Sequence, residues 1–151
     1  MDKQIGFTIL EMALVLIILA LVFGVITPVY NNFVVQANTE NVLDELKEIS
    51  DAIDEYFLDN GVYPDSLSDI FNPVPTDPWG NEYQYLKIKD TPPSGLGDMR
   101  KDKNLVPINS DYDLYSVGPD GKTTAPLTAK ASRDDIVRGR NGSFYGVATD
   151  Y

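Results

Sequence analysis

The chain opens with a long apolar run that carries one charge near its beginning. From Met12 to Thr27 no side chain is charged, and Thr27 is the only polar residue. A helix needs about 20 apolar residues to cross a bilayer, so the pattern predicts a membrane-spanning helix over residues 7–30. Glu11 lies in its first turns, where a carboxylate is costly and usually faces a partner or a pathway.

Beyond Pro28 the apolar positions recur every three or four residues, which is typical of an amphipathic helix. The apolar face consists of Val42, Leu43, Leu46, Ile49, Ile53, Tyr56 and Phe57, and the opposite face carries Glu40, Asp44, Glu45, Glu48, Asp51, Asp54 and Glu55. Gly61 is suited to a left-handed helix cap. We therefore expect one helix from the membrane to Leu58, kinked near Pro28, which lacks a backbone donor and crowds the preceding turn.

The remainder predicts a small sheet. A helical turn is expected over 64–70, a β-turn at Asp77-Pro78-Trp79-Gly80, a loop over 90–102, and strands over 81–88, 113–117 and 143–148. Trp79 is expected to fill the core rather than to bind a ligand. Three short strands against a long helix make an α+β domain.

Charge and composition narrow the classes of function. The formal net charge of −11 argues against nucleic acid and against anionic membrane surfaces as partners. The sequence has no Cys and no His, which excludes a thiol nucleophile, a Ser-His pair, a disulfide and the usual zinc sites. Lys3 precedes the apolar run, and the next basic residue is Lys47, so the N-terminus is expected in the cytoplasm.

Three interpretations of the apolar run are open at this point. A cleaved secretory signal would have an uncharged centre and a small-x-small cleavage site, whereas Glu11 interrupts the run and residues 26–30 offer no such site. A plain membrane anchor would place Glu11 at the interface. The third interpretation gives Glu11 a cationic partner, for which the free α-amine made by cutting the chain before Phe7 is a candidate.

The stretch Gly6-Phe7-Thr8-Ile9-Leu10-Glu11 resembles the prepilin peptidase site of type IV pilins and type II secretion pseudopilins. The resemblance implies cleavage between Gly6 and Phe7, N-methylation of Phe7, and Pro28 at the family's kink position. It implies a leader over 1–6, a membrane and filament-core helix over 7–30, and a periplasmic pilin-like domain over 31–151. Glu11 would then pair with the Phe7 amine of a neighbouring copy.

A candidate metal loop lies between Gly118-Pro119-Asp120-Gly121 and Asp134-Asp135. Carboxylates and carbonyls suit Ca²⁺, but the first segment is also an ordinary turn, and Ser132 with the Asp pair is equally a helix cap. The region resembles the calcium loop of the major pseudopilin. That resemblance implies Ca²⁺ held by side chains of Asp120, Asp134 and Asp135 and by the Val117 carbonyl, although residues 123–133 are longer than the family's usual loop.

The resemblance implies a structural subunit rather than an enzyme: a type II secretion pseudopilin that forms a filament driving protein export across the outer membrane. The implied partners are further copies of the chain, the prepilin peptidase, minor pseudopilins, and the inner-membrane assembly platform with its ATPase. The acidic helix face, which is otherwise simply solvated, is expected to meet Lys87, Arg133, Arg138 or Arg140 of adjacent copies. The alternatives are a type IV pilin, in which a disulfide is common, a minor priming pseudopilin, and a membrane-tethered binding or catalytic domain.

Overall fold

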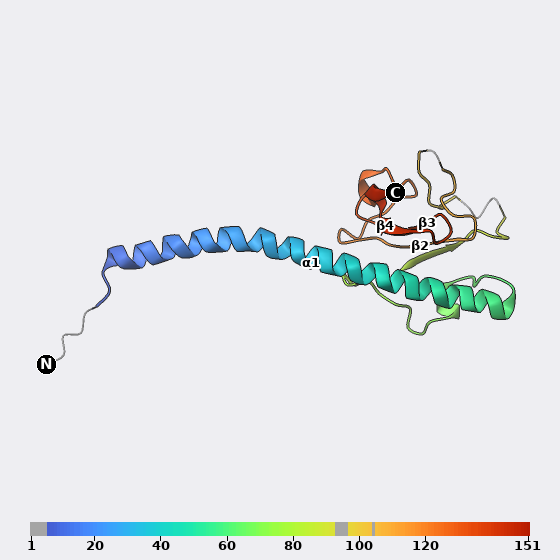
Figure 1. Cartoon of the computed structure of the whole chain (residues 1–151), viewed down its shortest axis with the longest axis horizontal. Coiled ribbons are helices and arrows are strands. Elements are labelled where there is room, and N and C mark those ends of the chain that lie inside the picture. The colour runs from blue at the N-terminus through green and yellow to red at the C-terminus, as the bar shows by residue number, and fades with distance from the viewer. Residues whose placement is uncertain (1–5, 93–96, 104) are drawn as a thin grey trace. The chain divides into compact units, whose positions relative to one another are not determined.

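The structure is a computed structural model that describes residues 6–92, 97–103 and 105–151, without the side chains of Val25 and Pro28. Within these residues the elements are one long helix, three 3₁₀ turns and four strands (Figure 1): α1 (Ile9–Asn60), η1 (Leu67–Asp69), β1 (Gln84–Lys87), β2 (Tyr112–Ser116), η3 (Lys130–Ser132), β3 (Ile136–Gly139), β4 (Phe144–Val147) and η4 (Ala148–Asp150). The chain divides into two compact units, Met1–Ala37 and Asn38–Tyr151. The predicted boundary after residue 30, between a membrane segment and a periplasmic domain, stays a prediction.

Local chemistry accounts for both ends of α1. The Thr8 hydroxyl accepts the Glu11 backbone N–H at 3.2 Å, and the Thr8 carbonyl accepts the Met12 N–H at 3.1 Å, so Thr8 caps the helix. At the other end Gly61 has a φ of +74°, and its N–H bonds the Phe57 carbonyl at 2.8 Å. This left-handed cap confirms the predicted end of the helix.

The helix is assigned without a break from Ile9 to Asn60, so the proline at position 28 does not end it. The kink expected at Pro28 concerns a residue whose side chain lies outside the described part of the structure. The kink therefore stays a prediction.

The sheet is antiparallel, with the strands in the order β1-β2-β3-β4. Strands near the three predicted segments are present. The fourth, β3, was not predicted, and it removes one of the two open interpretations of the loop: Asp134 and Asp135 do not begin a helix, because a strand follows them at Ile136. Ser132 ends the 3₁₀ turn η3 and does not cap a helix that follows it.

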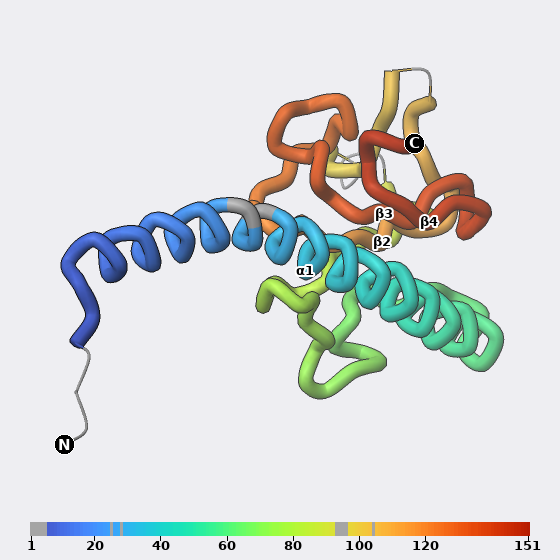
Figure 2. The backbone as a smooth tube through the Cα atoms, turned by 60° about the vertical axis from the view of Figure 1, so that its left-hand side comes forward, coloured from blue at the N-terminus to red at the C-terminus, as the bar shows by residue number. Residues whose placement is uncertain are grey.

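Both faces of the sheet are covered. On one face, the part of α1 in the second unit lies along the labelled strands (Figure 2) and buries Val42, Leu46, Ile49 and Ile53 against Leu67, Tyr83, Tyr112, Leu114 and Ile136. Trp79 packs at the rim of this cluster, as predicted. On the other face, Ile108 and Leu127 from loops form a second cluster with Val137 of β3 and Ala148 of η4, and Tyr115, Phe144 and Tyr151 pack around it.

The predicted turn at residues 77–80 is held by a buried carboxylate. Gly80 donates its N–H to the Asp77 carbonyl at 2.9 Å, and the Asp77 side chain accepts the N–H groups of Trp79 and Asn81. The Ser116 hydroxyl donates to the other Asp77 oxygen at 2.6 Å. The turn is thereby fastened to the end of β2.

Candidate functional site

The predicted processing signal lies before the first turn of α1. Gly6 and Phe7 are exposed and non-helical, and 74% of Phe7 is accessible. A peptide bond in this position is open to a protease without unwinding the helix. Cleavage there stays a prediction.

Glu11 occupies the third helical position after the Thr8 cap, so Thr8 and Glu11 have the spacing of a capping box. A carboxylate in the first turn also stabilises a helix through the helix dipole. The Thr-x-x-Glu spacing is readable in the sequence, and it gives Glu11 a local role in addition to the predicted pairing with an amine.

The first unit presents an apolar surface. The described residues from Gly6 to Phe33 are all exposed, and they include Ile9 at 91% and Leu10 at 80%. In the described part of the chain, one helix is long and apolar enough to cross a membrane. A surface of this kind requires lipid or other protein to cover it.

The predicted metal loop places the Asp134 carboxylate against the backbone of residue 120. Gly118, with a φ of +67°, packs against the Asp134 backbone, and Asp134 accepts the N–H of Asp120 at 3.2 Å. The Asp120 carboxylate in turn accepts the Lys122 N–H at 2.8 Å. Val117 follows β2 directly and is buried.

The side chain of Asp135, in contrast, pairs with an arginine. It is fully buried and forms an ion pair with Arg100, which is 1% exposed, and it accepts the Thr123 hydroxyl at 2.7 Å. Among the described residues, no group of three or more His, Cys, Asp or Glu side chains is arranged to hold a metal ion. Calcium binding stays a prediction, and Asp135 fits it poorly, because a guanidinium already neutralises its carboxylate.

Burial perturbs the acids around Arg100. Burial raises the pKa of Asp135, and the bonds from Thr123 and Arg100 oppose that rise without cancelling it. Asp113 lies near the same arginine: burial raises its pKa to about 6, against hydrogen bonds from the Arg100 N–H and the Asn109 amide.

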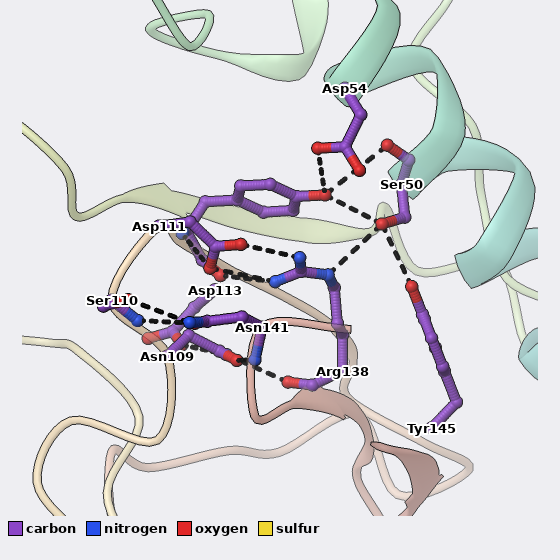
Figure 3. Close-up of polar contacts among 10 residues, drawn as sticks. Ser50, Asp54, Asn109, Ser110, Asp111, Asp113, Arg138, Asn141 and Tyr145 are labelled. Carbon is purple, nitrogen blue, oxygen red and sulfur yellow. Dashed lines mark hydrogen bonds and ion pairs between the residues drawn. The ribbon is translucent and has the colours of Figure 1, made fainter. Parts of the chain in front are cut away.

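A second buried arginine joins the sheet to the helix (Figure 3). The Arg138 guanidinium donates to both oxygens of Asp111, at 3.0 and 2.7 Å, and to the Ser50 hydroxyl on α1 at 3.2 Å. It also stacks 4.0 Å from the Tyr112 ring centre. Burial alone would lower the pKa of Arg138, but the bonds and charge of Asp111 reverse this and raise it.

Two of the four basic residues expected to meet neighbouring copies are therefore paired within the chain. Arg138 binds Asp111, and Lys87 bonds Asp65 at 2.8 Å. Arg133 and Arg140 are exposed. Neither buried arginine network was predicted, because no sequence pattern marks a buried arginine.

Comparison with known proteins gives consistent matches. The chain is 32% identical over 142 residues to the type II secretion system core protein G of Vibrio cholerae, a match that covers 81% of this chain and 85% of that protein. It is 30% identical over 141 residues to the protein of the same name from Pseudomonas aeruginosa, covering 80% and 87%. The protein of that name from Klebsiella pneumoniae is 27% identical over 157 residues, covering 90% and 94%.

No family model matches the chain, and no solved structure gives a significant match. The relatives alone therefore carry the assignment, and two of them match about four fifths of this chain at 30% identity or more. The long apolar helix and the small antiparallel sheet agree with the pilin-like fold expected from the sequence. The chain belongs to the type II secretion system core protein G family, the major pseudopilins.

Proposed function

We propose that this pseudopilin is cut between Gly6 and Phe7, methylated on the new amine, and polymerised into a helical filament that drives protein export across the outer membrane. Before assembly the subunit is held in the inner membrane by its apolar helix, with the N-terminus in the cytoplasm and residues 31–151 in the periplasm. The subunit acts as a structural element and not as an enzyme. Its partners are further copies of itself, the prepilin peptidase, minor pseudopilins, and the assembly platform with its ATPase.

The observation that carries this proposal is the exposed apolar surface from Ile9 to Phe33 behind an exposed Gly6-Phe7 bond. Lipid covers such a surface in a single membrane-bound subunit. When the subunit leaves the membrane, helices of neighbouring copies supply the equivalent cover. Stacked N-terminal helices meet this requirement without a change in the second unit.

Glu11 gives the stack its register. A carboxylate within an apolar bundle needs a cationic partner, and cleavage creates one at Phe7 of an adjacent copy. A buried pair of this kind is better suited to specifying alignment than to adding net stability.

The experiment separates the charge of Glu11 from its place in the capping box. Glu11→Gln keeps a residue that serves this position of a capping box but removes the charge. We expect it to be processed normally and to lose or greatly slow filament assembly, as should Glu11→Ala and Glu11→Leu. Electron microscopy of sheared filaments and mass spectrometry of the N-terminus give the two readouts.

The matched control is Glu48→Gln, which makes the same change at an exposed position of α1. It should assemble like the wild type. Normal filament yield from all three Glu11 variants would show that Glu11 is not needed for assembly. Native protein that still carries residues 1–6 would show that the proposed cleavage does not occur. In the host, deletion of the gene should stop export to the medium, and the wild-type gene should restore it.

A further inference from the structure

The loop that was expected to hold a cation is centred on an arginine. Arg100 comes from the segment before β2 and enters the region between β2 and β3. Its guanidinium bonds the Thr123 hydroxyl and the Thr124 carbonyl, each at 2.6 Å, and it pairs with Asp135. It also lies 4.2 Å from the Tyr115 ring centre. One buried cation thus connects residues 123 and 124, at the start of the long insertion, to residue 135, just beyond its end.

The two buried atoms of this pair that lack a hydrogen-bond partner among the described residues are Arg100 Nε, a donor, and Asp135 Oδ1, an acceptor. The contact of this pair is made by the other two atoms, Arg100 Nη2 and Asp135 Oδ2. A guanidinium and a carboxylate can pair through two parallel bonds, and one bond is formed here. The arginine thus holds one Asp135 oxygen, and the other has no partner among the described residues.

Backbone bonds extend the same connection. The Arg100 N–H donates to Asp113 at 2.6 Å and its carbonyl accepts the Ile108 N–H at 3.1 Å. Next to it, Lys101 donates its N–H to Ala125 and accepts that of Leu127. The segment around Arg100 is thus fixed to β2 and to the insertion at once.

Charge makes the arginine and a divalent cation alternatives at Asp135. A Ca²⁺ ion on this carboxylate would lie within a few ångströms of a buried guanidinium, where repulsion is screened weakly. The other two candidate carboxylates hold backbone N–H groups of the turn, Asp134 that of residue 120 and Asp120 that of residue 122. Each of the three thus has a structural use that requires no metal.

We propose that the Arg100 guanidinium takes the structural place of a divalent cation in this subunit, so that the loop between β2 and β3 forms and stays stable without Ca²⁺. The positive charge that neutralises Asp135 is then built into the chain. This inference concerns the folded subunit alone, so it does not depend on filament assembly.

The test uses the full-length processed protein in detergent. After dialysis against a chelator, thermal unfolding is followed by circular dichroism with and without about 1 mM CaCl₂, near the upper end of the affinities of extracellular calcium modules. A site with a Kd of roughly 0.1 mM would raise Tm by about 5 °C under these conditions. We expect a rise below about 2 °C, and a larger one overturns the proposal. Equilibrium dialysis with radioactive Ca²⁺ should likewise show no stoichiometric binding.

Variants of two loop carboxylates test whether Arg100 or a bound Ca²⁺ ion supports the loop. Asp120→Asn and Asp134→Asn should change Tm by no more than about 2 °C with or without Ca²⁺, because neither carboxylate holds the loop through a metal. A calcium-dependent loss of stability in either variant would contradict the proposal. Asp120 is exposed and Asp134 is partly exposed, so both variants are expected to fold. The result therefore does not depend on any arginine variant.

Arg100→Met should lower Tm by roughly 10 °C or more, since it leaves a buried carboxylate unpaired. Arg100→Met with Asp135→Leu should recover much of that loss, because both charges are then gone. If the single variant fails to fold, the Tm of the double variant relative to the wild type measures the contribution of the ion pair. If the double variant is no more stable than the single one, the pair is not the support of the loop.

Discussion

At the scale of single residues, Ser50 shows how a small polar side chain joins the helix to the sheet. Its hydroxyl bonds Tyr112 from β2 at 2.8 Å, Arg138 from β3 at 3.2 Å and Tyr145 from β4 at 3.0 Å. One position on α1 thus contacts three strands (Figure 3). Because these groups are buried, each depends on the others to satisfy its hydrogen bonds.

Arg138→Met should lower the free energy of unfolding by about 3–5 kcal/mol, because the change removes one partner of a buried ion pair. Urea unfolding followed by circular dichroism measures this loss. The control is Arg133→Met, the same change at an exposed position, which should stay within about 0.5 kcal/mol of the wild type. Equal effects of the two changes would show that the Arg138 network contributes nothing specific.

The raised pKa of Asp113 predicts the direction in which the stability of the fold changes with pH. Its pKa is raised from 3.8 to about 6 in the folded protein, so the folded state binds the proton more tightly than the unfolded state. Its contribution to stability is therefore fully present below pH 3.8 and is lost as the pH rises through about 6.

Between about pH 7 and about pH 5, acidification should therefore add on the order of 1 kcal/mol through this group. Urea unfolding at the two pH values measures the difference, and Asp113→Asn should reduce it by that amount. An unchanged pH difference in Asp113→Asn would assign the effect to other acids.

At the scale of elements, two glycines with nearly the same backbone conformation have different surroundings. Gly61 ends α1 with a φ of +74°, and a Cβ atom added there would meet no other atom within 4 Å. At Gly118, with a φ of +67°, an added Cβ would collide with the Asp134 carbonyl group. The first glycine is needed for its conformation alone. The second is needed for the conformation and for the close approach of two backbone segments.

Alanine substitutions should separate these two demands. Gly61→Ala should cost about 1–2 kcal/mol, the penalty for a left-handed L-residue. Gly118→Ala should cost clearly more, roughly 3 kcal/mol or above, because the Asp134 backbone must also shift. Equal losses of unfolding free energy, measured in urea, would show that the backbone of the loop between β2 and β3 can shift without an energetic penalty.

Elements set by local chemistry were predictable from the sequence. The capped end of α1, the turn at Asp77 and the strands near Tyr85 and Leu114 follow from apolar spacing and turn residues. β3 was missed because its four residues include Arg138, which faces the helix where a periodic pattern would place an apolar residue. Arg100 lies in a segment predicted only as a loop, and its pairing with Asp135 depends on contacts across 35 residues.

At the scale of the whole molecule, the two units have opposite requirements. The first presents apolar residues that need cover, while the second encloses a core that begins at Val42. The proposed leader, residues 1–6, carries one acid and one base, Asp2 and Lys3, so its removal would leave the side-chain net charge at −11. The proposed processing would therefore change the terminus and leave the net charge of the subunit unchanged.

A fragment from Asn38 to Tyr151 should fold on its own and stay monomeric in the absence of detergent. It retains the clusters on both faces of the sheet and lacks the apolar run. Size-exclusion chromatography and a cooperative thermal transition measure these properties. A fragment without such a transition would show that the first part of α1 is needed for the fold of the second unit.

The covered sheet also restricts how copies of the chain can touch. The helix packs on one face and loop residues pack on the other, and the strands at the rims of the sheet, β1 and β4, are each four residues long. Borders this short are poor templates for strand addition. The short rim strands thereby guard the subunit against amyloid-like stacking.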